Sequence, residues 1–169
     1  TQTDILIIGA GAAGLFCGFQ LGIRNRSVLI IDHANKAGKK ILMSGGGRCN
    51  FTNRSVNANQ FISKNPHFAK SALSQYTPDD FIRLVQKHGI DFHEKTLGQL
   101  FCDHKSKDIL NMLLTECEQA NVQIKLKTSI TNIKQQASNG FIVSTTIGKI
   151  KCNKLIIATG GLSIPTMGA

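Results

Sequence analysis

The chain opens with the stretch DILIIGAGAAG at residues 4–14, where four apolar residues lead directly into the pattern Gly9-x-Gly11-x-x-Gly14. This order predicts a buried strand, a glycine-rich turn and a helix of small residues. A second apolar run, SVLII at residues 27–31, ends at Asp32, 18 residues after Gly14. Such a strand-turn-helix-strand unit with a terminal acid is typical of a dinucleotide-binding fold, whereas a glycine pattern alone is weak evidence.

Each residue of this unit has a predicted task. Gly9 permits a tight turn, Gly11 lets the backbone approach a pyrophosphate, and Gly14 lets the helix pack close to the strand. The first N–H groups of the helix are left to bind the diphosphate. Asp32 is placed to accept hydrogen bonds from ribose hydroxyls and would repel a 2′-phosphate, which favours FAD or NAD over NADP. The alternative is a glycine-rich turn without a ligand.

Composition excludes several other classes. The 169 residues are 41% hydrophobic, which suits one ordinary globular core. Apolar runs reach about five residues, far too few to span a membrane, and no secretory signal is visible, so we expect a cytoplasmic protein. Five cysteines without a C-x-x-C pair indicate reduced thiols. The five histidines lack ligand spacing, so we expect no metal site.

The excess of basic over acidic residues raises the question of a nucleic-acid partner. Twenty Lys and Arg against ten Asp and Glu give a formal charge of +10. The lysines are scattered, no arginine-rich run occurs, and the chain has one Tyr and no Trp for base stacking. We therefore expect a solvated basic surface that attracts an anionic cofactor, and no nucleic-acid or membrane partner.

The remaining pattern predicts an α/β chain with a Rossmann-like fold: a parallel sheet with crossover helices plus a small antiparallel β-meander. Helices are expected at 12–21 with Gly22 as the residue after the end, at 67–76, after the cap Thr77-Pro78, and at 106–120. Short strands are expected within 90–102, 122–126, 130–133, 141–143 after a turn at 138–140, and 149–152. The last strand, 154–158, is apolar after Lys154 and is predicted to be buried in the parallel sheet.

Two further motifs stand out. The segment GKKILMSGGGRCNFTN at residues 38–53 lies within a long stretch, 37–53, that we expect to be irregular and functional. Its three glycines expose backbone N–H groups and Arg48 adds a fixed charge, which suits a flat cofactor ring or a phosphate; the alternative is a flexible loop. The second motif is Ala158-Thr159-Gly160-Gly161, at a strand's carboxyl end, where ligands bind in such folds.

Together the three motifs resemble the FAD-dependent oxidoreductases of the group that includes bacterial aminoacetone oxidase and a bile-acid 3-dehydro-Δ4,6-reductase. The segment with SGGGRCN and the ending ATGGLSIPTMGA carry this resemblance, which extends from Asp4 to Ala169. It implies that FAD is the cofactor, that Lys40 and residues 44–50 lie on the flavin side, and that the backbone of Ile130 meets the adenine. The cofactor-binding residues expected from the motifs and the resemblance are Gly9, Ala10, Gly11, Ala12, Ala13, Gly14, Asp32, His33, Lys40, Ser44, Gly45, Gly46, Gly47, Arg48, Cys49, Asn50, Ile130, Ala158, Thr159, Gly160 and Gly161.

The resemblance also implies what the whole protein does. Members of this group are much longer, so residues 1–169 are expected to be the first part of an FAD-binding domain that lacks a substrate domain and a closing segment. The expected function is flavin-dependent oxidation or reduction of an unidentified small organic substrate, with NAD(P)H as a candidate reductant. The alternative is a non-catalytic FAD- or NAD-binding module.

No catalytic residue is assigned from the sequence. Cys49 is a candidate because Arg48 beside it would lower its thiol pKa, but a redox pair needs a partner cysteine and none lies at C-x-x-C spacing. A small residue packed by the cofactor is the other interpretation of Cys49. The oligomeric state is also left open.

Overall fold

The structure is a computed structural model that describes residues 1–136 and 140–161. The chain forms two compact units: unit 1 is Thr1–Ile41 with Leu113–Ala169, and unit 2 is Leu42–Met112. Helix α2 (Lys39–Met43) begins in unit 1 and ends in unit 2, and α5 (Ser106–Gln119) runs from unit 2 into unit 1. The sequence pattern predicted one domain over 1–169 and did not indicate that residues 42–112 are a unit of their own.

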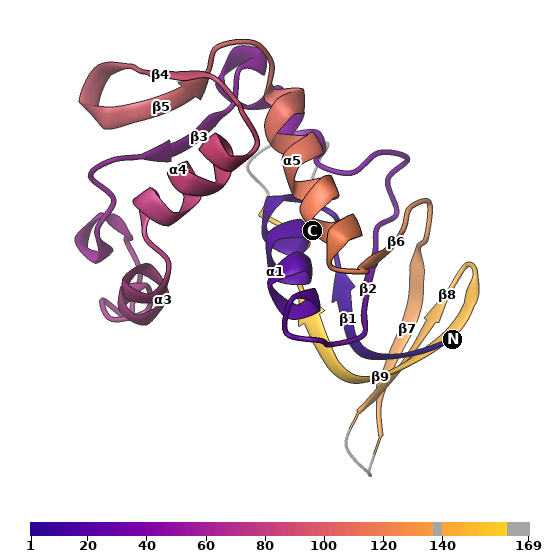
Figure 1. Cartoon of the computed structure of the whole chain (residues 1–169). Helices are drawn as coiled ribbons and strands as arrows, with labels where there is room; N and C mark the ends of the chain where they lie inside the picture. The colour runs from indigo at the N-terminus through magenta and orange to yellow at the C-terminus, as the bar shows by residue number, and fades with distance from the viewer. Residues whose placement is uncertain (137–139, 162–169) are drawn as a thin grey trace. The chain divides into compact units, whose positions relative to one another are not determined.

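Unit 1 is built on a six-stranded sheet in the order β6-β2-β1-β9-β8-β7 (Figure 1). Its members are β1 (Gln2–Ile8), β2 (Val28–Ile31), β6 (Gln123–Lys125), β7 (Ile130–Gln135), β8 (Phe141–Thr145) and β9 (Gly148–Ile157). Strands β6, β2, β1 and β9 pair in parallel, whereas β7, β8 and β9 form an antiparallel meander. The predicted Rossmann-like α/β fold with a small meander is therefore confirmed.

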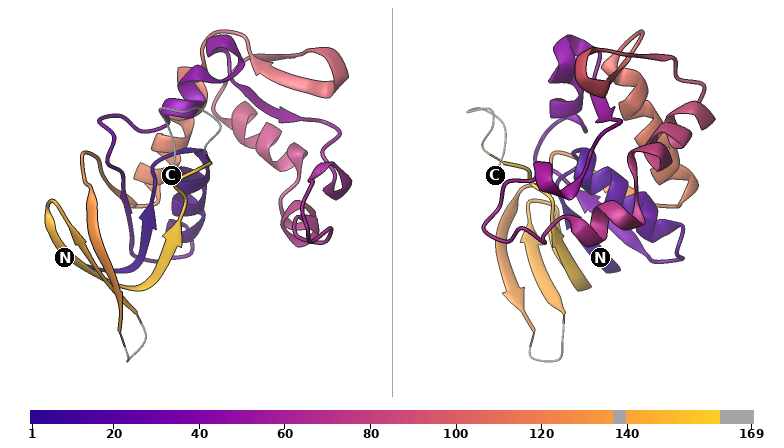
Figure 2. Two further views of the ribbon diagram at one scale, coloured as in Figure 1. Left: turned by 180° about the vertical axis from the view of Figure 1, so that it is seen from behind. Right: turned by 90° about the vertical axis from the view of Figure 1, so that its left-hand side faces the viewer.

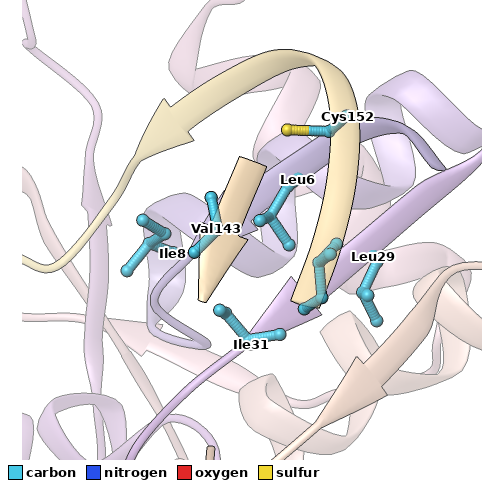
Figure 3. Packing of buried hydrophobic residues seen from close by; sticks show 7 residues of the cluster. Leu6, Ile8, Leu29, Ile31, Val143 and Cys152 are labelled. Carbon is cyan, nitrogen blue, oxygen red and sulfur yellow. The ribbon is translucent and has the colours of Figure 1, made fainter. Parts of the chain in front are cut away.

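The apolar runs of β1 and β2 are continuous because both faces of these strands are covered. On one face Leu6, Ile8 and neighbouring β2 residues pack against the meander, as Figure 3 shows for Val143 and Cys152. The other face meets α1 (Ala12–Gly22) through glycines: a Cβ on Gly18 would lie 2.7 Å from Cδ1 of Ile30. Close helix packing on one side and the meander on the other bury residues 5–8 of β1 and the whole of β2.

Strand β9 differs from its prediction in two ways. Residues 149–152 and 154–158 were expected to be separate strands, but Gly148–Ile157 is one strand (Figure 2). It pairs with β8 from Gly148 to Cys152 and with β1 from Lys151 to Ile157. The predicted burial of residues 154–158 is wrong in the described part of the chain, since Leu155 is partly buried and Ile157 is 61% exposed.

Gly22 does not have its predicted role. It belongs to α1, Ile23 caps the helix in a right-handed conformation, and the left-handed residue is Asn25, at φ 57°. A Cβ on Gly22 would lie 2.6 Å from the carbonyl oxygen of Ala120. A glycine is needed there for close backbone approach instead of for a turn.

Unit 2 is a small sheet with helices. Strands β3 (Asn50–Asn53), β5 (Gln99–Cys102) and β4 (Phe92–Glu94) pair in that order, antiparallel, with α3 (Lys70–Gln75) and α4 (Pro78–Lys87) in the same unit. Thr77 caps α4 through a reciprocal pair of bonds with Asp80, as predicted from the sequence. The stretch 37–53 is more regular than predicted, since it contains α2, a 3-10 turn at Ser44–Gly47 and β3.

Some predictions fall outside the described residues, namely most of the 138–140 turn and the LSIPTMGA ending after Gly161. Among residues 1–136 and 140–161, no helix combines the length and the apolar character needed to cross a membrane.

Candidate cofactor-binding site

The three glycines of the first turn are held in different surroundings. Gly9 has φ +110°, and a Cβ there would lie 2.3 Å from the carbonyl oxygen of Ala158. A Cβ on Gly14 would lie 1.8 Å from the carbonyl oxygen of Gly9. A Cβ on Gly11, by contrast, would meet no atom within 4 Å. Gly9 and Gly14 are thus required by packing inside the protein, while Gly11 borders open space.

The N-terminus of α1 offers donors to that space. Gly11 is the residue before the helix and provides no side-chain cap, and no acid occurs in the first turn. Ala12 and Ala13, the first helical residues, are exposed. Backbone N–H groups and the positive end of the helix dipole therefore face solvent, which is the arrangement that binds phosphate. The predicted pyrophosphate site has the required local structure.

Ala10 takes part through the protein itself. Its N–H donates to Oδ2 of Asp32 at 2.8 Å, and its carbonyl oxygen accepts from the N–H of Gly38 at 2.8 Å. Ala10 is fully buried. Its backbone holds the turn in shape and connects it to the start of the 38–53 segment.

Asp32 lies directly after β2, and its carboxylate oxygens already accept hydrogen bonds from the protein backbone. Oδ2 accepts from Ala10 and Oδ1 accepts from the N–H of Ala34, each at 2.8 Å, and the side chain is 17% exposed. Each oxygen keeps a second lone pair for a ribose hydroxyl. Nδ1 of His33 lies 3.7 Å from Oδ1, on a side chain that is 80% exposed. Asp32 therefore both stiffens the glycine turn and remains available to a ligand.

The segment before Ile130 lies beside the end of β2. The N–H of Thr128 donates to the carbonyl oxygen of Asp32 at 2.9 Å, and the N–H of Lys127 donates to the carbonyl oxygen of Ala34 at 2.9 Å. Ile130 itself is partly buried against the core of the sheet. The fold thus brings the predicted adenine segment close to the predicted ribose-binding acid.

The motif after β9 also lies at this edge of the sheet. The N–H of Ala158 donates to the carbonyl oxygen of Ile8 at 2.7 Å, directly before Gly9. The Lys40 ammonium donates to the carbonyl oxygen of Gly161 at 2.5 Å and lies beside Gly160, whose φ is +82°. Lys40, the glycine turn and residues 158–161, which are far apart in sequence, therefore meet within unit 1.

The Gly45–Gly47 triad belongs to unit 2 and has an ordered geometry. All three glycines have positive φ, from 57° to 86°. A Cβ on Gly45 would lie 2.8 Å from both the N of Asn50 and the ring of Phe101, whereas Gly46 and Gly47 have nothing within 4 Å. The N–H of Cys49 donates to the carbonyl oxygen of Ser44 at 3.1 Å. One glycine is needed for packing, and the other two leave room for an approaching group.

The thiol of Cys49 is not activated as the sequence suggested. It is buried, and burial raises its pKa against the lowering effect of a hydrogen bond with Ser44, so the expectation that Arg48 lowers this pKa is wrong. A neighbouring thiol does exist: burial, and then the charge on Cys49, raise the pKa of Cys102 to about 12. All five cysteines are free thiols. The pair is protonated at neutral pH and therefore weakly nucleophilic.

A cluster of polar side chains in unit 2 was missed by the sequence interpretation. Nδ1 of His93 lies 2.6 Å from Oδ1 of Asp103, and the His93 ring stacks on Phe101 with 6.3 Å between centroids. The Lys95 ammonium lies 4.3 Å from the centroid of the same Phe101 ring. Alternation along the short strands expected within 90–102 would have placed His93 and Lys95 on one face. No group of three or more His, Cys, Asp or Glu in the described chain is arranged to hold a metal ion.

Fold and local geometry together define a Rossmann-type domain whose candidate dinucleotide site lies at the carboxyl ends of its strands. The family model described as "HI0933-like protein Rossmann domain" matches residues 3–169, and the chain belongs to this family. FAD is the cofactor that membership of this family supports, and the open space at Gly11, the uncapped helix and Asp32 fit it.

Three comparisons describe the relatives. "Ribosomal RNA dihydrouridine synthase" of Escherichia coli is 53% identical over 166 residues, covering 98% of this chain and 41% of that protein. "3-dehydro-bile acid delta(4,6)-reductase" of Clostridium scindens is 26% identical over 166 residues, covering 96% and 40%. L-proline dehydrogenase from P. horikoshii shares the fold with a TM-score of 0.63 at 12% identity, covering 98% of this chain and 55% of that one.

These relatives refine the resemblance. The bile-acid reductase belongs to the group that the sequence motifs indicated, but the ribosomal RNA enzyme is about twice as similar in sequence, at 53% against 26%. The chain spans about two fifths of the length of both curated relatives.

Proposed function

We propose that this chain is the FAD-binding part of a flavin-dependent reductase that converts uridine in ribosomal RNA to dihydrouridine. The observation that carries the proposal is the 53% identity, over 98% of the chain, to a protein named ribosomal RNA dihydrouridine synthase. The substrate domain and the segment that completes the flavin pocket then belong to the part of the longer protein outside these residues. This proposal replaces our expectation of a small organic substrate and no nucleic-acid partner.

The distribution of charge supports an RNA substrate. Residues 33–78 contain no Asp or Glu, but they contain seven Lys and Arg, namely Lys36, Lys39, Lys40, Arg48, Arg54, Lys64 and Lys70. The basic residues are scattered, as the sequence analysis found, but the acids are missing from more than a quarter of the chain. A long segment with one sign of charge favours a polyanion.

The roles of the site residues form part of the proposal. The N–H groups at residues 11–14 bind the FAD diphosphate, Asp32 binds the adenosine ribose, and the segment at Ile130 contacts the adenine. Lys40 orders residues 158–161 near the diphosphate. Gly46 and Gly47 leave room for the flavin ring. When bound, FAD supplies a hydride that it has received from a nicotinamide cofactor, while the protein supplies position, charge and exclusion of water.

The test uses the complete protein that contains these residues. Its absorbance spectrum is recorded before and after denaturation to measure FAD, and it is then incubated with NADH or NADPH and with ribosomal RNA from cells that lack its gene. We expect stoichiometric FAD and the appearance of dihydrouridine in that RNA by mass spectrometry. FAD-loaded protein that reduces 3-oxo-Δ4,6 steroids but no uridine would favour a small-molecule reductase, the function named for the 26% identical relative.

A further inference from the structure

One face of the unit 2 sheet carries a row of polar groups next to the glycine triad. The strand register pairs His93 of β4 with Phe101 of β5, and Phe101 with Asn50 of β3. Residues paired in adjacent strands point to the same face. His93, Phe101 and Asn50 therefore lie side by side, and Asn50 is the last residue of the SGGGRCN motif.

Within this row the imidazole of His93 is held by a carboxylate. Nδ1 lies 2.6 Å from Oδ1 of Asp103, and the two side chains are 37% and 40% exposed. The Phe101 ring lies nearly parallel to the imidazole, at an interplanar angle of 20° with 6.3 Å between the centroids. A His whose Nδ1 is engaged by a carboxylate has a defined ring orientation, and Nε2 remains as its reactive nitrogen. His93 is accessible and is oriented before any substrate arrives.

A second His–Asp pair in the same unit lacks this order. His104 and Asp91 are separated by 3.8 Å between Nε2 and Oδ2, and their side chains are 74% and 76% exposed. It is a long contact between two exposed side chains, and exposed pairs of this kind contribute little. The contrast makes His104 a natural control for His93.

The ring that supports His93 also touches the glycine triad. Phe101 is buried and lies so close to Gly45 that a Cβ there would be 2.8 Å from its ring. Gly45, Phe101 and His93 thus follow one another in contact within unit 2, while Gly46 and Gly47 beside Gly45 border open space. If the triad borders the flavin, as in the proposed function, only the side chain of Phe101 separates His93 from that border.

We propose that His93 is the proton donor for reduction of the uracil ring, with Asp103 as its positioning residue. This inference rests on the proposed function. It assigns a catalytic group where the sequence analysis had none.

The chemistry needs such a group. In uracil the C5=C6 double bond is conjugated with the C4 carbonyl, so C6 accepts the hydride from the reduced cofactor and C5 becomes an enolate carbon. His93 then gives its Nε2 proton to C5. The π bond is lost, two C–H bonds form, and the uracil is reduced by two electrons that a nicotinamide cofactor supplied to the flavin. The imidazole recovers its proton from water.

The experiment separates the two half-reactions in the complete, FAD-loaded protein. His93→Gln, Asp103→Asn and the control His104→Gln are first reduced with NADPH or NADH in the absence of oxygen and then mixed with ribosomal RNA, and flavin reoxidation is followed at about 450 nm. General-acid catalysis is worth about a hundredfold or more. We expect His93→Gln to slow reoxidation by at least that factor and to retain a solvent deuterium isotope effect, because C5 must then take its proton from water. Flavin reduction, FAD content and RNA affinity should stay unchanged.

The other variants test the role of the pair. Asp103→Asn should slow reoxidation by about tenfold and leave RNA affinity unchanged, because the ring is present but less well oriented. His104→Gln should react like the wild type. Wild-type reoxidation in His93→Gln, or an equal loss in its reduction by nicotinamide, would overturn the inference for His93 alone. A wild-type protein that reduces no uridine would overturn the proposed function, and the inference with it.

Discussion

Replacing Gly11 with alanine should separate cofactor binding from stability. The backbone at Gly11 has φ −87° and ψ −171°, an extended conformation that any residue adopts, and a Cβ there would meet no protein atom within 4 Å. The apo-protein should therefore unfold within about 0.5 kcal/mol of the wild type. The same Cβ would fill the space where the diphosphate approaches the helix N-terminus.

The loss of affinity follows from the hydrogen bonds that this methyl group would block. A bond from a backbone N–H to a charged group contributes about 1.5–3 kcal/mol. Losing two such bonds at the lower end costs about 3 kcal/mol, which corresponds to roughly a hundredfold in Kd. Fluorescence titration of the apo-protein with FAD measures this change, and urea unfolding of the same sample measures stability.

Gly14→Ala is the matched control. Its Cβ would lie 1.8 Å from the carbonyl oxygen of Gly9, a backbone atom that cannot move away alone. Overpacking of this kind lowers the free energy of unfolding by about 3 kcal/mol or more. This exceeds the roughly 1 kcal/mol by which alanine is favoured over glycine in a helix, so the variant should be less stable than the wild type. If Gly11→Ala bound FAD with the wild-type Kd, or unfolded as easily as Gly14→Ala, the division of roles between the two glycines would be refuted.

Three further predictions concern other parts of the chain. Gly45→Ala and Gly46→Ala both place a Cβ at positive φ, but only the first meets a ring and a backbone nitrogen at 2.8 Å, so urea unfolding should show it less stable than the second by about 1–3 kcal/mol; equal stabilities would contradict the packing role. Asp32→Ala removes the acceptor of two backbone N–H groups and should lower both stability and FAD affinity, by about 1.5–3 kcal/mol per bond to the charged group, whereas unchanged stability would argue against its hold on the turn. Burial raises the pKa of Cys102 to about 12 and that of Cys117 to about 11, from 9.0. The two protonated thiols therefore contribute to the free energy of unfolding below pH 9, and this contribution should be lost as the pH rises from 9 to 12. Unfolding curves of the double alanine variant should show a smaller loss of stability over the same pH range.

Local pattern was sufficient for much of the fold. The apolar runs before Gly9 and Asp32 predicted the first two parallel strands, and the Thr77-Pro78 cap predicted the start of α4. These features are encoded by neighbouring residues, because a strand or a cap depends on side chains a few positions apart. Longer-range features were not predictable in this way. Gly22 was assigned to the position after the helix end because its actual neighbour, Ala120, lies 98 residues away in sequence.

The candidate site likewise has local features that the sequence predicts and long-range features that it does not. By itself the sequence determined the glycine turn, the acid after the second strand and the motif after the last one, since each is a short pattern with its own local conformation. Only the tertiary structure decided that Gly11, unlike Gly9 and Gly14, borders open space, that burial raises the Cys49 pKa, and that His93 is held by Asp103 on the same face as Phe101. Open space, burial and side-chain orientation depend on atoms contributed by distant segments, and only folding brings these together.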